Sequence, residues 1–240
     1  MIGRRPLGEA DRLVSFYTRE FGRLSGVAKG ARRPRTRFGG SLELFSQGHL
    51  LFFETERSQL VRVDHFDLLH SFVTVREELE RFGQGAWVVE CLGRLTPERD
   101  PHAALYGLLT RTLRALEAFA RPERARLAFA LRCVDLLGHR LRLDRCLACG
   151  GTPVAPNLDF TAGGLVCRAC ATLAADSLAV SGQALAALRR FRTLRWEELL
   201  AAPLSRAVEA EVASTVEAHV VRLLGHPLRT LRFLVQTRLN

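Results

Sequence analysis

The spacing of apolar residues changes once along this chain, near residue 68. Before that point apolar and polar residues alternate with a period of two, which is typical of half-buried strands. After it, apolar residues recur at i, i+3, i+4 and i+7, the period of amphipathic helices. Because each pattern buries one face only in its own type of element, the sequence predicts a strand-rich head followed by a helical body.

The head contains five short segments rich in Val, Leu, Phe and Thr, separated by glycines or polar residues. These predicted strands are residues 12–18, 22–30, 41–47, 49–56 and 59–66. Several short strands at close spacing favour a small β-barrel or a sandwich. A β-meander with no binding role fits the same pattern, and the strands alone do not distinguish the two.

The body contains seven segments with a helical period. They are residues 68–82, 84–95, 102–120, 123–140, 181–200, 204–225 and 227–239. We expect breaks at Gly83, Pro97–Pro101 and Pro122. Ser181 is a predicted N-cap, and Gly225–Pro227 predicts a helix end. The sequence therefore predicts an α+β chain of three parts: a β-barrel over 1–68, a helical domain over 69–143 and 177–240, and a cysteine module over 144–176.

Four of the six cysteines form two C-x-x-C pairs, Cys146–Cys149 and Cys167–Cys170, with 17 residues between them. Two turns that each offer a pair of thiolates can close a tetrahedron around one soft divalent ion. Four thiolates leave no open coordination position, so the pattern predicts one structural zinc ion and not a hydrolytic centre. Such pairs also favour a reducing, cytoplasmic setting over a disulfide framework.

Two redox dithiols are an alternative reading of the four cysteines, although the βαβ setting of a thioredoxin-like site is absent. The remaining cysteines, Cys91 and Cys133, lie on apolar faces of predicted helices and are interpreted as core residues.

The net charge of the 240-residue chain is +10, and all but one of its basic residues are arginines. Such a balance favours an anionic partner: nucleic acid first, an anionic membrane surface second. No segment approaches the roughly 18 apolar residues of a membrane span, and the first residues hold no apolar core of a secretory signal. We therefore expect a nucleic-acid partner and no membrane.

The densest run of positive charge is AKGARRPRTRFGG, residues 28–40. Its five basic residues are Lys29, Arg32, Arg33, Arg35 and Arg37, with no acidic residue among them. Glycines and a proline exclude a helix face or a buried strand. The run predicts a loop at the rim of the barrel that tracks phosphates without reading bases. A solvated basic loop with no ligand is the alternative.

Other residues near this loop extend the predicted binding surface. Arg19 and Arg23 flank a predicted strand turn, and aromatic residues are interleaved with the basic ones. Single-strand-binding barrels stack bases on such rings. Neighbouring residues of a strand point to opposite faces, so one of Phe16 and Tyr17 is expected in the core. Tyr17, with its polar tip, is the predicted exposed ring.

A second basic stretch, residues 188–195, contains Arg189, Arg192 and Arg195. It is interpreted either as an extension of the nucleic-acid track or as an ordinary solvated helix face.

Catalytic motifs are missing from the sequence. The chain has no P-loop, dinucleotide-binding fingerprint, H-E-x-x-H or nucleophile elbow. Asp64 and His65 are adjacent, so on one strand they point to opposite faces. The acidic run Glu77–Glu80 is interpreted as a solvated helix face. We therefore expect a binding protein with no catalytic residue.

The stretch RRPLGEADRLVSFYTREFGRLSGVAKGARRPRTR resembles the N-terminal domain of the RecO family of bacterial recombination mediators. The matching positions are Arg5, Gly8, Glu9, Asp11, Leu13, Thr18, Gly22, Ala28, Lys29, Gly30 and Arg32. The later order, a helical body interrupted by a four-cysteine module, is also similar to that family. The resemblance covers essentially the whole chain, specifically in the head and only in pattern beyond it.

The resemblance implies an OB-fold head that binds single- and double-stranded DNA. It also implies annealing of complementary strands without nucleotide hydrolysis, and partnership with RecR and with the C-terminal tail of the single-stranded-DNA-binding protein SSB. Through these partners such a protein helps RecA to load onto coated strands. Family members usually carry a longer N-terminus that supplies the first barrel strand. We therefore expect a barrel that is incomplete or closed differently, or upstream residues outside this sequence.

Two other functions compete with this one. A zinc-ribbon adaptor would mainly bind proteins, and its positive charge would follow from arginine-rich composition. A nucleic-acid enzyme such as a nuclease would cleave DNA with a divalent ion. Salt-dependent DNA binding and a cleavage assay separate the three.

Overall fold

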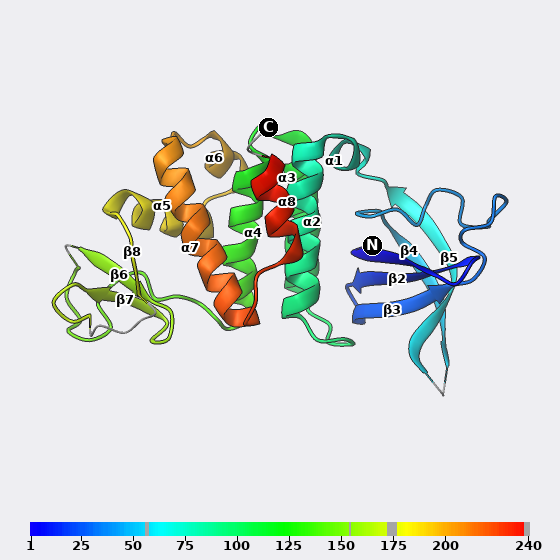
Figure 1. The fold of residues 1–240 in the computed structure, drawn as a ribbon, viewed down its shortest axis with the longest axis horizontal. Coiled ribbons are helices and arrows are strands. Elements are labelled where there is room, and N and C mark those ends of the chain that lie inside the picture. Colours follow the sequence, from blue (N-terminus) through cyan, green and yellow to red (C-terminus); the bar gives the residue numbers. More distant parts are fainter. Residues whose placement is uncertain (56–57, 154, 172–176, 238–240) are drawn as a thin grey trace. The chain divides into compact units, whose positions relative to one another are not determined.

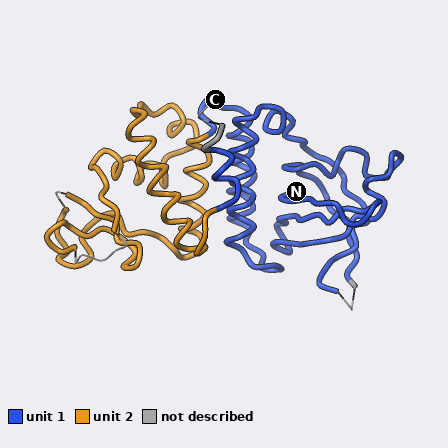
Figure 2. The backbone as a smooth tube through the Cα atoms, in the orientation of Figure 1, with its two compact units in different colours: residues 1–122, 228–240 blue, residues 123–227 orange. Residues whose placement is uncertain are grey.

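The computed structural model describes residues 1–55, 58–153, 155–171 and 177–237. The chain divides into two compact units: Met1–Pro122 with Leu228–Asn240, and Glu123–Pro227 (Figure 2). A β-sheet forms the head, helices form most of the rest, and the four cysteines lie on and beside a small second sheet. The α+β class predicted from the change in apolar period is therefore confirmed. The predicted end of the cysteine module at residue 176 lies outside the described residues.

The head is one five-stranded sheet in the order β1-β2-β3-β5-β4 (Figure 1). Its strands are β1 (Gly3–Leu7), β2 (Asp11–Thr18), β3 (Gly22–Ala28), β4 (Gln47–Thr55) and β5 (Ser58–His70). β3 pairs with β5 in parallel, and the other neighbours are antiparallel. This is a Greek-key sheet of the OB type. Among the described residues no pairing joins β1 to β4, so the sheet is not closed.

Among the described residues, the open strand order agrees with the expected incomplete barrel. One strand was not predicted: β1 lies directly before Gly8 and pairs along β2. Its sequence, GRRPL, shows little alternation because an exposed edge strand buries few side chains and tolerates Pro6. Residues 41–46, predicted to be a strand, form turns instead, because Phe45 has a positive φ of 71° and its N–H donates to the Met1 carbonyl.

The core of the head lies on one face of the sheet. Val14, Phe16, Val61, Val63 and Phe66 are all buried together there. Gly26 lies among them on β3, and a Cβ built on it would fall 2.7 Å from Cγ2 of Val61 and 2.8 Å from the Val61 carbonyl oxygen. The parallel pairing of β3 with β5 therefore depends on a residue without a side chain at this position.

In the described part of the first unit the helices are α1 (Val73–Glu77), α2 (Leu79–Leu95), α3 (Ala103–Ala118) and α8 (Arg229–Thr237). The predicted break at Gly83 is wrong, because α2 continues through it and the chain bends at Glu78, where φ and ψ are extended. Gly83 allows α8 to pack closely against α2, because a Cβ at this position would lie 2.8 Å from Cδ2 of Leu234 on α8. Glu90 of α2 fixes the start of α8 by accepting hydrogen bonds from the Arg229 and Thr230 N–H groups.

The second unit contains four helices and the small sheet. The helices are α4 (Pro122–Leu136), α5 (Gly182–Thr193), α6 (Trp196–Ala201) and α7 (Arg206–Leu224). The strands of the small sheet are β6 (Pro156–Asp159), β7 (Gly164–Cys167) and β8 (Ser177–Ala179). The predicted N-cap is confirmed, since the Ser181 hydroxyl accepts from Ala184 N–H, and Gly225 ends α7 with a φ of 75°. Residues 181–200 form two helices instead of one, because the chain is extended at Leu194 and Arg195.

Buried ion pairs join α4 to α7 within this unit. Arg124, which is almost fully buried, pairs with Glu209 and also donates to the Leu200 and Ala202 carbonyls. Arg126 has no exposed side-chain surface and lies 2.9 Å from a carboxylate oxygen of Glu217. Several arginines of this chain therefore stabilise the fold itself. No helix in the described part of the chain is long and apolar enough to cross a membrane.

Replacement of Gly26 by alanine tests the close approach of β3 and β5. We expect Gly26→Ala to lower the free energy of unfolding by about 1–3 kcal/mol, because the new methyl group overpacks the strand pair. Gly40→Ala is the control: nothing lies within 4 Å of a Cβ there, and we expect a change within about 0.5 kcal/mol. Urea unfolding followed by circular dichroism measures both, and equal midpoints would contradict the predicted crowding.

Candidate nucleic-acid interface and metal centre

The basic loop, residues 29–46, connects β3 to β4, and its inner side is part of the sheet core. Ala31, Phe38 and Leu42 are buried with the core residues of the strands. The loop turns at Gly30, whose φ is 68°, and the Gly30 N–H donates to a carboxylate oxygen of Asp11 at 2.8 Å. These contacts fix the loop at both ends, so its outer residues are held in place.

Two of the five basic side chains in the loop brace the fold. The Arg32 guanidinium donates to the Gly8 carbonyl at 2.8 Å, and its N–H donates to the Ala10 carbonyl. The Arg37 guanidinium donates to the Val63 carbonyl at 3.2 Å and lies 3.8 Å from a carboxylate oxygen of Asp64. Both are exposed in part, yet much of their hydrogen-bonding capacity is already used.

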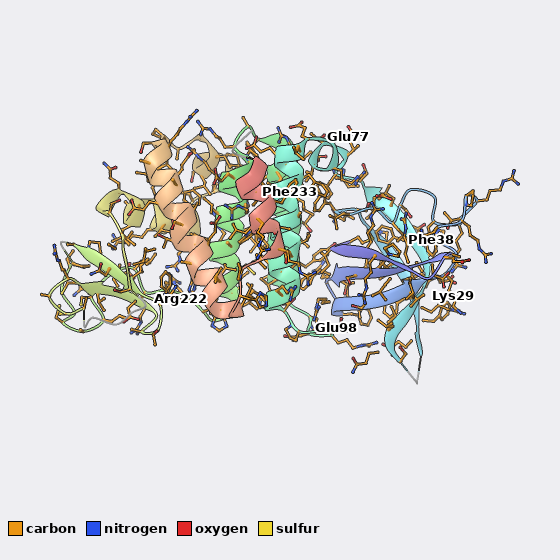
Figure 3. All side chains as sticks on the ribbon, viewed as in Figure 1. Lys29, Phe38, Glu77, Glu98, Arg222 and Phe233 are labelled. Atoms are coloured by element: carbon orange, nitrogen blue, oxygen red, sulfur yellow. The ribbon has the colours of Figure 1, made fainter. Side chains whose placement is uncertain are left out.

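The other three basic side chains, Lys29, Arg33 and Arg35, are exposed. Within the described part of the chain they have no ion-pair or side-chain hydrogen-bond partner. Lys29 lies at the surface of the sheet region in Figure 3, whereas Phe38 lies inside it. Of the flanking arginines, Arg19 is exposed at the β2–β3 turn and Arg23 lies 3.9 Å from Glu98. The structure thus leaves three cations of the loop available to an anionic ligand.

The prediction that Tyr17 presents its ring to solvent is wrong. Its exposed fraction is only 5%, and Phe16, on the other face of β2, is also buried. Both lie near the end of β2, where the chain lines a cavity of about 490 Å³ together with Tyr106 and Leu109 of α3. Because a helix covers this end of the strand, alternation along β2 no longer separates a core side from a solvent side.

The second basic stretch does not form a track of free cations. Arg189 donates to the Leu143 carbonyl at 2.9 Å, and Arg192 donates to the Leu141 carbonyl at 2.7 Å. The Arg192 guanidinium also lies 3.1 Å from Asp135 and is nearly buried. Both arginines therefore brace the segment that leads to the first cysteine pair. Arg195 projects into solvent near Glu197, and Arg190 is also exposed.

The four cysteines predicted to bind metal meet in the structure. The sulfur atoms of Cys146, Cys149, Cys167 and Cys170 all lie within 4.8 Å of one another, and those of Cys149 and Cys167 are 3.8 Å apart. A tetrahedral ion with metal–sulfur bonds of about 2.3 Å places its ligands about 3.8 Å from each other. The cluster therefore has the donor set and the dimensions to hold one soft divalent metal ion.

Backbone hydrogen bonds shape the two cysteine turns. Gly150, at a φ of 73°, donates to the Cys146 carbonyl, and the Cys170 N–H donates to the Cys167 carbonyl, both at 2.9 Å. The backbone N–H groups of Cys149 and Cys167 point towards the Cys146 sulfur atom. Their hydrogen bonds lower the pKa of that thiol to about 6. Hydrogen bonds that the Cys170 thiol donates to the sulfur atoms of Cys167 and Cys149 raise the pKa of Cys170 to about 12. These shifts favour a thiolate at Cys146 and a protonated thiol at Cys170. A bound divalent cation would instead stabilise all four thiolates together.

The cysteine module is attached to α7 by aromatic packing. Phe160, in the turn between β6 and β7, stacks on His219 with ring centroids 5.7 Å apart, and the Arg222 guanidinium lies 4.6 Å from the Phe160 ring centre. Burial lowers the pKa of His219, so its ring is neutral, and its Nε2–H donates to the His139 carbonyl at 3.0 Å. The other two cysteines, Cys91 and Cys133, are fully buried, as predicted.

Sequence reasoning missed an exposed aromatic residue on the sheet. Phe53 of β4 is 47% exposed, and the Arg62 guanidinium of β5 lies 4.7 Å from its ring centre. The signal in the sequence was the segment HLLFFETE, in which Phe52 and Phe53 must point to opposite faces. Which of the two faces the core was decided only by the register of β4 against β5.

Comparison with known proteins agrees with this architecture. The family described as "Recombination protein O N terminal" matches residues 1–72, and "Recombination protein O C terminal" matches residues 76–232. "DNA repair protein RecO" of Myxococcus xanthus (strain DK1622) is 34% identical over 234 residues, which are 97% of this chain and 93% of the relative. The protein of the same name from Anaeromyxobacter sp. (strain Fw109-5) is 37% identical, over 95% of this chain and 90% of the relative.

The sulfur cluster makes a prediction about metal content. We expect the purified chain to hold one divalent ion, and Cys167→Ser to lose it because three thiolates no longer close the tetrahedron. Cys133→Ala, which removes a buried thiol far from the cluster in sequence, should keep one ion. Elemental analysis of extensively dialysed protein measures the stoichiometry. Equal metal content in the two variants would contradict a four-thiolate site.

Proposed function

Because this chain belongs to the RecO family of DNA repair proteins, we propose that it binds single- and double-stranded DNA and acts as a recombination mediator. In this proposal it anneals complementary strands without nucleotide hydrolysis. Together with RecR it helps RecA to load onto strands coated with SSB, whose C-terminal tail it contacts. Its place of action is the bacterial cytoplasm, on nucleoid DNA.

The observation that carries the proposal is the anchored basic loop. Lys29, Arg33 and Arg35 have no ion-pair partner among the described residues, while Arg32, Arg37 and the buried Phe38 hold the loop in place. An unpaired, pre-positioned cation is available to a phosphate without first breaking an internal ion pair. Contacts of this kind supply most of the sequence-independent affinity for DNA, because each neutralised phosphate releases condensed counterions. Arg19 extends the same positive surface to the β2–β3 turn.

Annealing follows from the same charges. Two complementary strands repel each other through their phosphates, and cations that neutralise both strands lower that repulsion. No hydrolysis is required for this step, since pairing of the bases is itself favourable once the strands meet. The residues therefore act by binding, and no residue of the chain is assigned a catalytic role in this proposal.

The metal proposed for the cysteine cluster is zinc, with a structural role. Four thiolates suit zinc in a closed tetrahedral site, and no position remains for a water molecule or a substrate. The ion would fix the two cysteine turns and, through Phe160 and its contact with His219, the module against α7. A zinc-ribbon adaptor without DNA binding is the other candidate function, and it is less favoured because it gives the unpaired loop cations no ligand.

Removal of the three unpaired cations tests the DNA-binding role. We expect Lys29→Ala/Arg33→Ala/Arg35→Ala to weaken binding to single-stranded DNA and to reduce the slope of log affinity against log salt by about 2, the value for three lost phosphate contacts. Fluorescence anisotropy with a labelled oligonucleotide from about 50 to 200 mM salt measures both.

The matched control replaces three exposed arginines elsewhere. Arg111→Ala/Arg114→Ala/Arg206→Ala removes the same net charge from α3 and α7. We expect its salt slope to stay near that of the unsubstituted chain. If both triple variants lower the slope equally, binding follows overall charge and the loop has no special role.

Strand annealing is the second test of the proposed function. Two complementary oligonucleotides, one of them coated with SSB, should pair faster with the protein than with SSB alone, in the absence of ATP. The three-residue loop variant should lose most of this acceleration. Intact DNA binding with no acceleration would reduce the protein to a passive DNA-binding module.

A further inference from the structure

One row of side chains crosses the outer face of the five-stranded sheet. Its members are given by the register of each strand pair: Arg5 opposite Leu13, Leu13 opposite Val27, Val27 opposite Arg62, and Arg62 opposite Phe53. Directly opposed residues of neighbouring strands point to the same face. The row therefore runs from β1 at one edge of the sheet to β4 at the other.

This row faces away from the core. The residues next to it along the strands, among them Val14, Ala28, Val61 and Val63, are buried in the core cluster. Since successive residues of a strand alternate between faces, the row lies on the opposite side. Its two ends are exposed, and between them Leu13 and Val27 are half-buried. The result is an apolar strip with an arginine at β1 and an arginine and an aromatic ring at β5 and β4.

The aromatic end of the row has the features of a stacking platform. Phe53 keeps nearly half of its surface exposed, although a large apolar ring normally packs against other side chains. The only cation over its ring among the described residues is Arg62, at 4.7 Å. A flat ring beside a guanidinium plane offers two stacking surfaces and one positive charge within a few ångströms.

Three acidic residues near the row already have partners. Glu54 lies 2.6 Å from Arg99, Glu98 accepts from the Ser25 hydroxyl, and Asp64 lies beside Arg37 of the basic loop. In the described part of the chain, Arg5 and Arg62 have no acidic partner. Within the described residues, no ion pair therefore neutralises the two arginines of the row.

We propose that this outer face binds single-stranded DNA, with one base stacked on Phe53 and phosphates of the same strand held by Arg62 and Arg5. The two arginines are three strand spacings apart, about 14 Å, which suits phosphates of one short segment. The proposal rests on the DNA-binding function proposed above. It assigns a contact to the bases of the strand, whereas the basic loop accounts only for contacts with phosphates. Single strands are the ligand because the bases of a duplex are already stacked and paired, whereas unpaired bases can stack on a ring.

Replacement of Phe53 tests the stacking contact. We expect Phe53→Ala to weaken binding of a single-stranded oligonucleotide by about 10- to 100-fold, the range for loss of one base–aromatic stack. Leu51→Ala is the matched control, because Leu51 lies two residues away on the same face, is 54% exposed and has no ring. It should bind as the unsubstituted chain does, and Phe53→Trp should restore binding because it keeps a flat ring.

Two readouts separate stacking from phosphate contact. An oligonucleotide of abasic sites keeps the phosphates but has no bases, so Phe53→Ala should bind it as tightly as the unsubstituted chain does. The slope of log affinity against log salt should also be unchanged in Phe53→Ala, because no cation is removed. A 2-aminopurine base in the strand should change fluorescence on binding to the unsubstituted chain and less so on binding to Phe53→Ala.

The outcomes distinguish this inference from the proposed function. If the unsubstituted chain shows no salt-dependent DNA binding, the proposed function fails. If it binds and Phe53→Ala binds the normal strand equally well, DNA binding stands and the stacking site is overturned. Equal losses for Phe53→Ala and Leu51→Ala, or a change in sedimentation of Phe53→Ala without DNA, would identify the face as an apolar contact between copies of the chain and also overturn it.

Discussion

The burial of Phe38 and Leu42 under the basic loop is the contact on which the rest of the head depends. A loop with five basic residues in nine repels itself, and solvated it would have no single conformation. Here its apolar residues fill the core of the sheet, and Asp11 accepts a hydrogen bond from Gly30 at the point where the loop leaves β3. The loop is therefore ordered by the core, and its outer cations are positioned without ion pairs of their own.

The arginines of the chain divide into two groups with different physical roles. Buried or bracing arginines, such as Arg124, Arg126 and Arg192, satisfy backbone carbonyls and carboxylates that would otherwise be unpaired in the interior. Within the described residues, Lys29, Arg33 and Arg35 of the loop have no such partners. The net charge of +10 therefore overstates the charge available to a ligand, and only the position of each side chain shows which cations can bind phosphate.

The four-cysteine module contributes order where a hydrophobic core is small. Its sheet has three short strands, which by themselves bury little apolar surface. The sulfur cluster joins its two turns, and the stacked pair of Phe160 and His219 attaches the module to α7. A donor set of four thiolates leaves no open coordination position for chemistry on a bound ion.

The sequence by itself determined the features that depend on local pattern. The change of apolar period placed the sheet and the helices, the two C-x-x-C pairs placed the cluster, and the small polar or flexible residues Ser181 and Gly225 marked helix ends. These signals are local because periodicity, turn geometry and capping involve residues close together in the chain. The RecO motif in the head was readable for the same reason.

Only the tertiary structure decided which side chains face solvent. Tyr17 is covered because α3 lies against the end of β2, and Phe53 is exposed because the register with β5 turns Phe52 to the core. α2 continues through Gly83, where α8, which is far away in sequence, packs closely against the helix. Each outcome depends on a partner distant in the chain, and a one-residue shift of a strand exchanges its two faces. The apolar pattern of a segment indicates whether it forms a helix or a strand. The packing of the whole chain decides which of its side chains are exposed.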